Sequence, residues 1–181
     1  MQHKKISTQT LAYIALFTAL IAALSQISIP MPLGLPMTLQ TFIIPLYGVV
    51  LGAKLGTWAV LAYIMIGIIG LPVFSGGGSG IGWLFGPTGG FLIGFPFYAF
   101  FAGLGAKSKK VFPFIGGLLL GMLVTYTIGM LQFAWVTDQS IARAFTIVVL
   151  QFLPTELIKL VFVWILGRNL QRILARSGYL Q

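Results

Sequence analysis

A carboxylate and an ammonium group lie three residues apart in one of the most apolar parts of the sequence. The stretch 153–160 reads LPTELIKL and contains Glu156, one of only two acidic residues, followed by Lys159. A spacing of three on a helix lets the two groups neutralise each other as a simple ion pair. Ionisable groups in apolar membrane segments are costly, however, and usually face a bundle interior or a cavity where they have a function. We therefore predict that both bind a ligand that offers an oxygen acceptor and N–H donors.

The composition indicates that the whole chain is a membrane protein. Of its 181 residues, 58% are hydrophobic and 7% are charged, whereas soluble domains contain about 25% charged residues. The length suits one helical bundle, so we predict a single transmembrane ligand-binding domain over residues 1–181. We predict no metal site, because the chain has no cysteine and its only histidine is His3.

Apolar runs separated by breakers predict an all-α bundle of six transmembrane helices. Pro154 favours a helix start near Leu153, because proline suits the first turn of a helix. The basic start and first apolar run could also be a signal peptide, but the run is long enough to span and no clean cleavage site follows. The predicted helices are 11–29, 38–51, 57–70, 91–105, 112–136 and 153–175, with a tight turn at 52–56 that makes the second and third a helical hairpin.

Basic residues predict the orientation of this bundle. The net charge of +9 could suggest nucleic-acid binding, but the charges lie at segment ends, as expected for membrane orientation. With six spans, only Arg143 falls on one side, and we predict that the other side, with both termini, is cytoplasmic. The basic residues predicted there are Lys4, Lys5, Lys54, Lys107, Lys109, Lys110, Arg168, Arg172 and Arg176.

Three unusual connections then lie together on the outer face: the Pro-rich loop 30–36, the Gly-rich segment 71–90 and the segment 137–152, whose first part 137–144 we expect to be a polar loop. The Gly-rich segment, LPVFSGGGSGIGWLFGPTGG, is not expected to be helical. No GxxxxGK[ST] motif occurs in the chain, so we do not expect it to hydrolyse ATP through a P-loop. We interpret the segment as a lid whose aromatic side chains cover an apolar ligand. These side chains are Phe74, Trp83 and Phe85.

Polar side chains gather near the predicted outer ends of the helices. Each of them alone would be an ordinary helix-terminus residue, but as a group around one mouth they could line a pocket. They are Thr38, Gln40, Thr41, Thr88 and Gln151. We include them in the predicted ligand site with Glu156 and Lys159.

Small residues recur every four positions in the first helix, at Ala15, Ala19 and Ala23. This spacing makes a smooth face on which another helix can pack closely. The spacing alone favours packing inside this bundle over a contact with a second protein.

Four stretches, in order and at similar spacing, resemble the BioY family, the biotin-specific subunits of energy-coupling-factor (ECF) vitamin transporters. They are IPMPLGLPMTLQTF, GLPVFSGGGSG, GPTGGFLIGF and LPTELIK, at 29–42, 70–80, 86–95 and 153–159. The resemblance implies a six-helix substrate-binding (S) subunit of a prokaryotic cell membrane, which captures biotin outside without chemical change and uses no cofactor. It also implies three partner chains, namely a transmembrane coupling subunit and two ATPase subunits.

The same resemblance gives roles to particular residues. It implies that Glu156 and Lys159 contact the ligand and that the alanine face of the first helix meets the coupling subunit. The family often has Gly-Asp where this chain has Thr155-Glu156, and often has an Asn in the Gly-rich loop, for which Ser79 is the replacement that we predict. Phe91 stands where a Tyr is common.

Other functions fit the sequence less well. An S subunit for another vitamin would share the fold and the alanine face. A solitary, ion-coupled biotin carrier usually needs intramembrane acids, and only Glu156 is available. An intramembrane enzyme lacks support, because the chain has no metal-ligand set, no aspartate pair and no internal histidine.

Overall fold

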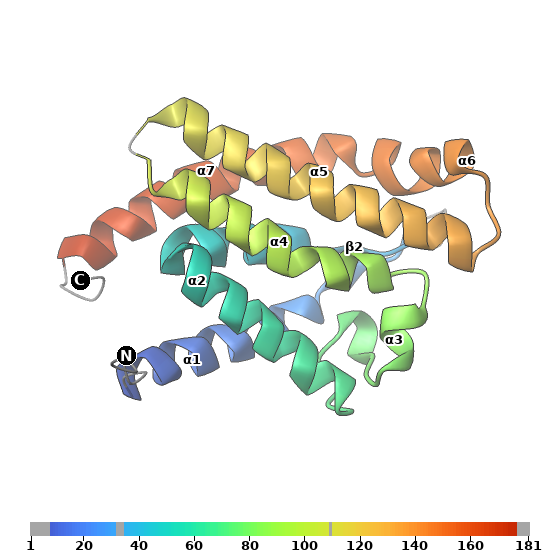
Figure 1. The fold of residues 1–181 in the computed structure, drawn as a ribbon, viewed down its shortest axis with the longest axis horizontal. Coiled ribbons are helices and arrows are strands. Elements are labelled where there is room, and N and C mark those ends of the chain that lie inside the picture. Colours follow the sequence, from blue (N-terminus) through green and yellow to red (C-terminus); the bar gives the residue numbers. More distant parts are fainter. Residues whose placement is uncertain (1–7, 32–34, 109, 177–181) are drawn as a thin grey trace, which may run out of the picture.

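The computed structural model describes residues 8–31, 35–108 and 110–176, and most of them are helical (Figure 1). The predictions for Lys4, Lys5, Lys109 and residues 32–34 of the Pro-rich loop therefore lie outside the described residues. The elements are α1 (Thr8–Ser25), β1 (Ser28–Ile29), β2 (Met37–Thr38), α2 (Gln40–Ile68), a 3-10 turn (Ser75–Gly77), α3 (Gly82–Phe85), α4 (Gly89–Ala106), α5 (Val111–Val136), α6 (Ile141–Phe145), a π-helical turn (Thr146–Leu150) and α7 (Leu153–Arg176).

Four of the described helices, α1, α2, α4 and α5, are long and apolar enough to cross a membrane. A fifth candidate span forms if 141–150 and 153–174, which meet at a bend of 43°, count as one. Large apolar side chains point outward along these helices, and Phe112, for example, is 90% exposed. Such a surface suits contact with lipid, and the chain is a multi-pass membrane protein by this criterion.

The predicted hairpin of two helices is one hydrogen-bonded element, α2, that breaks at a single residue. Gly52 has φ +79° and ψ 166°, a conformation that glycine adopts readily. The expected turn over 52–56 is thus too long, because the residues after Gly52 are already helical. The two arms pack closely, since a Cβ added to Gly56 would lie 2.7 Å from the Cα of Gly48.

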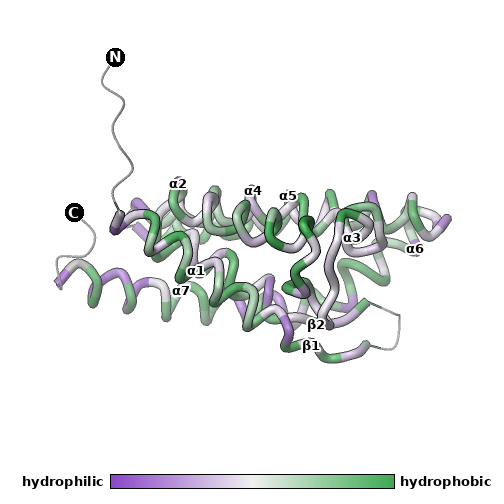
Figure 2. Tube along the Cα trace, turned by 90° about the horizontal axis from the view of Figure 1, so that it is seen from below, coloured by the Kyte–Doolittle hydropathy of each residue, from purple (hydrophilic) through white to green (hydrophobic). Residues whose placement is uncertain are grey.

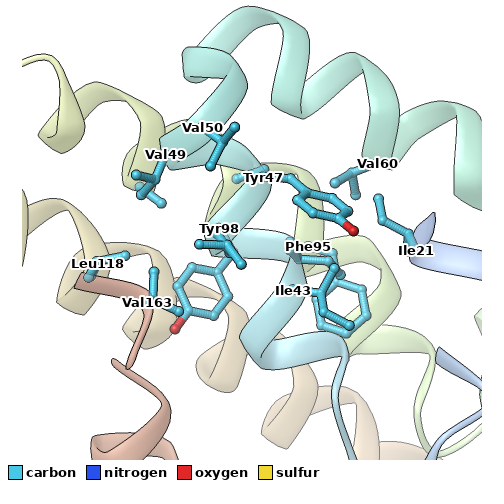
Figure 3. Close-up of a cluster of buried hydrophobic side chains, with 14 of the residues drawn as sticks. Ile21, Ile43, Tyr47, Val49, Val50, Val60, Phe95, Tyr98, Leu118 and Val163 are labelled. Carbon is cyan, nitrogen blue, oxygen red and sulfur yellow. The ribbon is translucent and has the colours of Figure 1, made fainter. Parts of the chain in front are cut away.

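The core lies where α1, α2, α4, α5 and α7 converge (Figure 3). Tyr98 of α4 is fully buried there, with Leu118 of α5 and Val163 of α7 beside it. Small residues bring α4 and α5 together, as expected for helices in a membrane. A Cβ at Gly94 would be 2.8 Å from the Cα of Thr125, whose hydroxyl donates to the Gly94 carbonyl at 3.1 Å.

The connections contain more regular structure than the sequence predicted. Residues 28–29, expected at the end of the first helix, form β1, which pairs antiparallel with β2 and closes the Pro-rich loop at its base. The Gly-rich segment includes the four-residue helix α3, although no helix was expected. The predicted polar loop 137–144 contains the start of α6, because the Ser140 hydroxyl caps it by accepting from the Arg143 amide at 3.3 Å.

Six of the eight described basic residues, all except Arg143 and Lys159, belong to segments near one end of the molecule, where α1 begins and where α7 ends in a hydrophilic stretch (Figures 1 and 2). The α2 break beside Lys54 and the α4–α5 connection lie at this end, whereas α3 and α6, which carries Arg143, lie at the other. Arg168 of α7 donates to the carbonyl of Ser108 at 2.8 Å, which ties α7 to the α4–α5 connection. The helix ends and connections that were predicted to share one side of the bundle therefore do lie together. Which end of the molecule faces the cytoplasm stays a prediction.

Candidate ligand-binding site

A cavity of about 450 Å³ opens near the end of the molecule that holds β2 and α3. Its walls come from the Pro-rich loop, the first turn of α2, the Gly-rich segment, α4, α5 and the start of α7. Among the residues that line it are Leu35, Met37, Thr38, Gln40, Thr41, Phe74, Ser75, Trp83, Pro87, Thr88, Phe91, Leu92, Phe95, Tyr126, Phe152, Glu156 and Lys159. The volume lies within the roughly 300–1,000 Å³ typical of small-molecule pockets.

The ammonium group of Lys159 has a protein acceptor for each of its three N–H donors. Its Nζ lies 2.6 Å from Glu156 Oε1, 2.8 Å from Thr41 Oγ1 and 3.0 Å from the Thr38 carbonyl oxygen. The Thr41 hydroxyl in turn donates to Glu156 Oε1 at 2.7 Å. The start of α2 and the start of α7 are thus joined by a compact triangle of charge-assisted hydrogen bonds.

Glu156 uses only one of its two oxygens in this arrangement. The side chain is 1% exposed, and its Oε2 is buried without a hydrogen-bond partner among the described residues. A buried carboxylate oxygen without a hydrogen-bond donor is unfavourable, and such a group in a native structure points to a bound partner or a function. Oε2 is therefore an acceptor in the cavity wall, which Tyr126 also lines, that has no hydrogen-bond donor among the described residues.

The other predicted polar residues divide into those that reach the cavity and those that do not. Thr38, Gln40, Thr41 and Thr88 line it, and Gln40 is held in place by a 2.7 Å hydrogen bond from its Nε2 to the Tyr63 hydroxyl. Two of the predicted residues are not among the lining residues. One is Ser79; the serine of the Gly-rich segment that lines the cavity is Ser75 instead. The other is Gln151, whose side-chain amide is buried without a partner among the described residues. Their contact with a ligand stays a prediction.

Two of the three predicted lid aromatics form part of the cavity wall. Phe74 is buried, and its ring lies 5.7 Å from that of Tyr63 and 6.3 Å from that of Trp83. Glycines make room for both, because an added Cβ at Gly67 would fall 2.1 Å from the Phe74 ring and one at Gly78 would fall 2.2 Å from the Trp83 ring. Phe85 is 66% exposed and does not line the cavity, so its predicted covering role is wrong.

The sequence matches the BioY family over residues 1–176, which is nearly the whole chain. The chain belongs to the BioY family. It is 37% identical over 166 residues to the "Probable biotin transporter BioY" of Pyrococcus horikoshii, covering 92% of this chain and 98% of that protein. It is 39% identical over 181 residues to the "Biotin transporter BioY2" of Lactococcus lactis, covering 98% and 97% of the two chains.

A solved structure agrees with this assignment. It is the crystal structure of the S-component for biotin from an ECF-type ABC transporter, which is 29% identical and superposes with a TM-score of 0.83 over 95% of each chain. The predicted resemblance to BioY proteins is confirmed. BioY is a transporter family, which agrees with the expectation that the chain is not an enzyme.

Sequence reasoning missed several residues of the cavity in this BioY chain. Tyr126 is the most informative of them, because it brings a hydroxyl to the wall and packs edge-to-face on Phe91 with ring centroids 5.3 Å apart. A signal was present, since Thr125, Tyr126 and Thr127 form a polar trio within an apolar helix. Leu92, Phe95 and Phe152 gave no such signal, because apolar wall residues look like any other membrane-helix residues.

The alanine face of α1 does not pack inside the bundle. Ala15, Ala19 and Ala23 are all exposed, whereas the opposite face of the helix carries the buried residues Thr18 and Ile21. Thr18 fixes this orientation by donating to the Ala59 carbonyl at 3.0 Å. The interpretation as internal packing, which spacing alone favoured, is wrong, because no described residue covers this face; its contact with a coupling subunit stays a prediction.

Proposed function

We propose that this chain is the biotin-binding S component of an ECF-type importer, and that it captures biotin in the 450 Å³ cavity. The observation that carries the proposal is the Oε2 of Glu156, which has no partner among the described residues, next to the saturated ammonium of Lys159 in a largely aromatic and apolar wall. Biotin offers ureido N–H donors and a carbonyl, an apolar sulfur ring and chain, and a terminal carboxylate, which suit such a wall.

We infer an orientation for the polar contacts from the donors and acceptors that are free. Glu156 Oε2 accepts a ureido N–H, because it is the acceptor without a partner among the described residues. Lys159 can reach a ligand oxygen only by giving up one of its present bonds, and the bond to the Thr38 carbonyl, at 3.0 Å, is the longest of the three. The aromatic walls exclude water and thereby strengthen both contacts.

The proposed topology counts the two arms of α2 as separate spans and the bent 141–174 pair as one, which gives six with α1, α4 and α5. The basic end then faces the cytoplasm with both termini, and the cavity faces outward. We assign the protein to the prokaryotic plasma membrane, with a transmembrane coupling subunit against the alanine face and two ATPase subunits that drive release inward. Neither cofactor nor metal is needed for capture, and the chain itself performs no chemistry on the ligand.

Reconstitution tests this proposal against its rivals. The chain alone in liposomes is expected to bind labelled biotin but not to accumulate it in response to an ion gradient. Accumulation is expected only when the partner subunits and ATP are added. Gradient-driven accumulation by the chain alone would show that it is a solitary carrier. Stronger binding of a different vitamin in a competition assay would show that biotin is not its substrate.

A further inference from the structure

We propose a second binding site, for the phosphate group of an anionic phospholipid, between the start of α5 and the C-terminal part of α7. A cavity of about 290 Å³ lies there, at the basic end of the molecule and away from the 450 Å³ cavity. Its lining residues are Val111, Trp164, Ile165, Arg168, Asn169 and Arg172. Trp164, Arg168 and Arg172 follow at intervals of four and so share one face of α7.

Arg168 is held in a fixed position in this site. Its Nη2 donates to the carbonyls of Ser108 and Lys110 at 2.8 and 3.3 Å, and its guanidinium carbon lies 4.6 Å from the centre of the Phe114 ring. These contacts use two of the five guanidinium N–H donors. The remaining donors belong to a group that is already ordered, so binding an anion would require little further loss of freedom.

The site is rich in unused donors and has no negative charge of its own. The indole Nε1 of Trp164 is buried without a hydrogen-bond partner among the described residues. The chain has only two acidic residues, Asp138 and Glu156, and Glu156 is bound to Lys159 in the other cavity. Asp138 lies between α5 and α6, at the opposite end of the molecule. No acidic side chain is therefore available to Arg168 and Arg172, and an anion from outside the chain can supply their counter-charge.

The surroundings favour a lipid over a free anion. Phe112 is 90% exposed beside the site, and Val111 and Ile165, which line it, are 46% and 44% exposed. These apolar side chains can contact acyl chains while the arginines contact the phosphate above them. Basic pockets between helices at the cytoplasmic membrane surface bind anionic headgroups in this way.

Quenching of tryptophan fluorescence tests the lipid site. The full chain in neutral detergent micelles would be titrated with acyl-brominated phosphatidylglycerol or phosphatidylcholine, with and without inorganic phosphate. We expect half-quenching at about tenfold lower mole fraction of the anionic lipid. The Trp164→Phe variant should lose this selective component, which assigns the signal to the site.

Charge-matched variants separate a specific site from general attraction. Arg172→Gln should lose the anionic preference, whereas Arg143→Gln, which removes the same charge at the other end, should keep it. Equal losses in both variants would overturn the proposal in favour of diffuse electrostatics. Competition by inorganic phosphate at millimolar concentration would show a free-anion site, and an unchanged lipid preference in Arg172→Gln with loss of the transporter complex would show a partner-protein contact.

A separate observation leads us to infer that Gln26 is a positioning residue for the Gly-rich segment. This inference rests on the proposed function. Gln26 follows α1 directly, and its side-chain Nε2 donates to the carbonyls of Pro72 and Phe74 at 3.3 and 3.1 Å. Its Oε1 accepts from the Gly77 amide at 2.9 Å. One side chain thus holds both limbs of the turn that presents Phe74 and Ser75 to the ligand cavity.

The position of Gln26 links two surfaces of the molecule. The adjacent Ser25 hydroxyl also donates to the carbonyl of Val73, which belongs to the Gly-rich segment. Two consecutive residues at the end of α1 therefore hold this segment. The same helix carries the exposed alanine face. A displacement of α1 by a partner would therefore pull directly on the wall of the cavity, although Gln26 itself does not line it.

Dissociation kinetics test the role of Gln26. In Gln26→Ala we expect labelled biotin to dissociate about tenfold faster, with an association rate within about twofold of the parent. Gln9→Ala is the matched control, because Gln9 is exposed on the same helix and, within the part of the chain that the structure describes, its Nε2 bonds only to Tyr13 of that helix. An unchanged dissociation rate in Gln26→Ala would overturn the inference, whereas failure of the parent chain to bind biotin would overturn the proposed function instead.

Discussion

Lys159→Met is expected to abolish measurable biotin binding, with an affinity loss of at least about a hundredfold. The substitution keeps the apolar stem of the side chain and removes the ammonium. Glu156, which is 1% exposed, then loses its counter-ion, and leaving one member of a buried ion pair alone costs about 3–5 kcal/mol. Isothermal calorimetry or equilibrium dialysis with the purified protein measures the affinity, and thermal unfolding in detergent measures the stability.

A double variant separates the two roles of the pair. Glu156→Gln combined with Lys159→Met removes both charges, so the stability lost in Lys159→Met alone should largely return. Binding should not return, because both the free carboxylate oxygen and the ammonium are gone. Recovery of binding in the double variant would mean that the two side chains only hold each other. Thr155→Ala is the local control, because among the described residues the Thr155 hydroxyl bonds only to the Phe152 carbonyl, and the variant should bind as the parent does.

The charged pair could be found from sequence because charge is rare in this chain. An acid and a lysine in an apolar run stand out whatever fold surrounds them, and Pro154 located the helix start correctly. The third member of the triangle, Thr41, was predicted only as one polar residue among several near the mouth. Its contact with Glu156 joins residues 115 positions apart, and nothing local in the sequence specifies such a distance.

Which face of each helix points into the bundle was harder to predict from the sequence. In water, the apolar face of a helix is the buried face, but in a membrane the outer surface is apolar too, so periodicity carries little information. The alanine face of α1 illustrates this, because its spacing fits an internal contact as well as an external one. Likewise, the Gly-rich segment was interpreted as a lid, but the sequence did not specify that Gly78 leaves the space in which the Trp83 ring packs.

Ala19→Trp is expected to abolish biotin transport by the assembled system while biotin binding by the chain alone stays within about twofold. Ala19 is exposed, so an indole can point away from the bundle without displacing a core residue. On the alanine face, however, it would hold a partner helix away from the close approach that small residues permit. We expect uptake to fall by more than about tenfold, with co-purification of the coupling subunit reduced in parallel.

Leu131→Trp provides the control, because Leu131 is also exposed on a long apolar helix but lies on α5, across the bundle from α1. It introduces the same side chain into a lipid-facing position and should leave uptake and complex formation unchanged. If Ala19→Trp lost binding or failed to fold, α1 would have to pack through its alanines in the intact protein. If it transported normally, the coupling subunit would have to bind another surface. A contact on α1 could then not move the Gly-rich segment through Gln26.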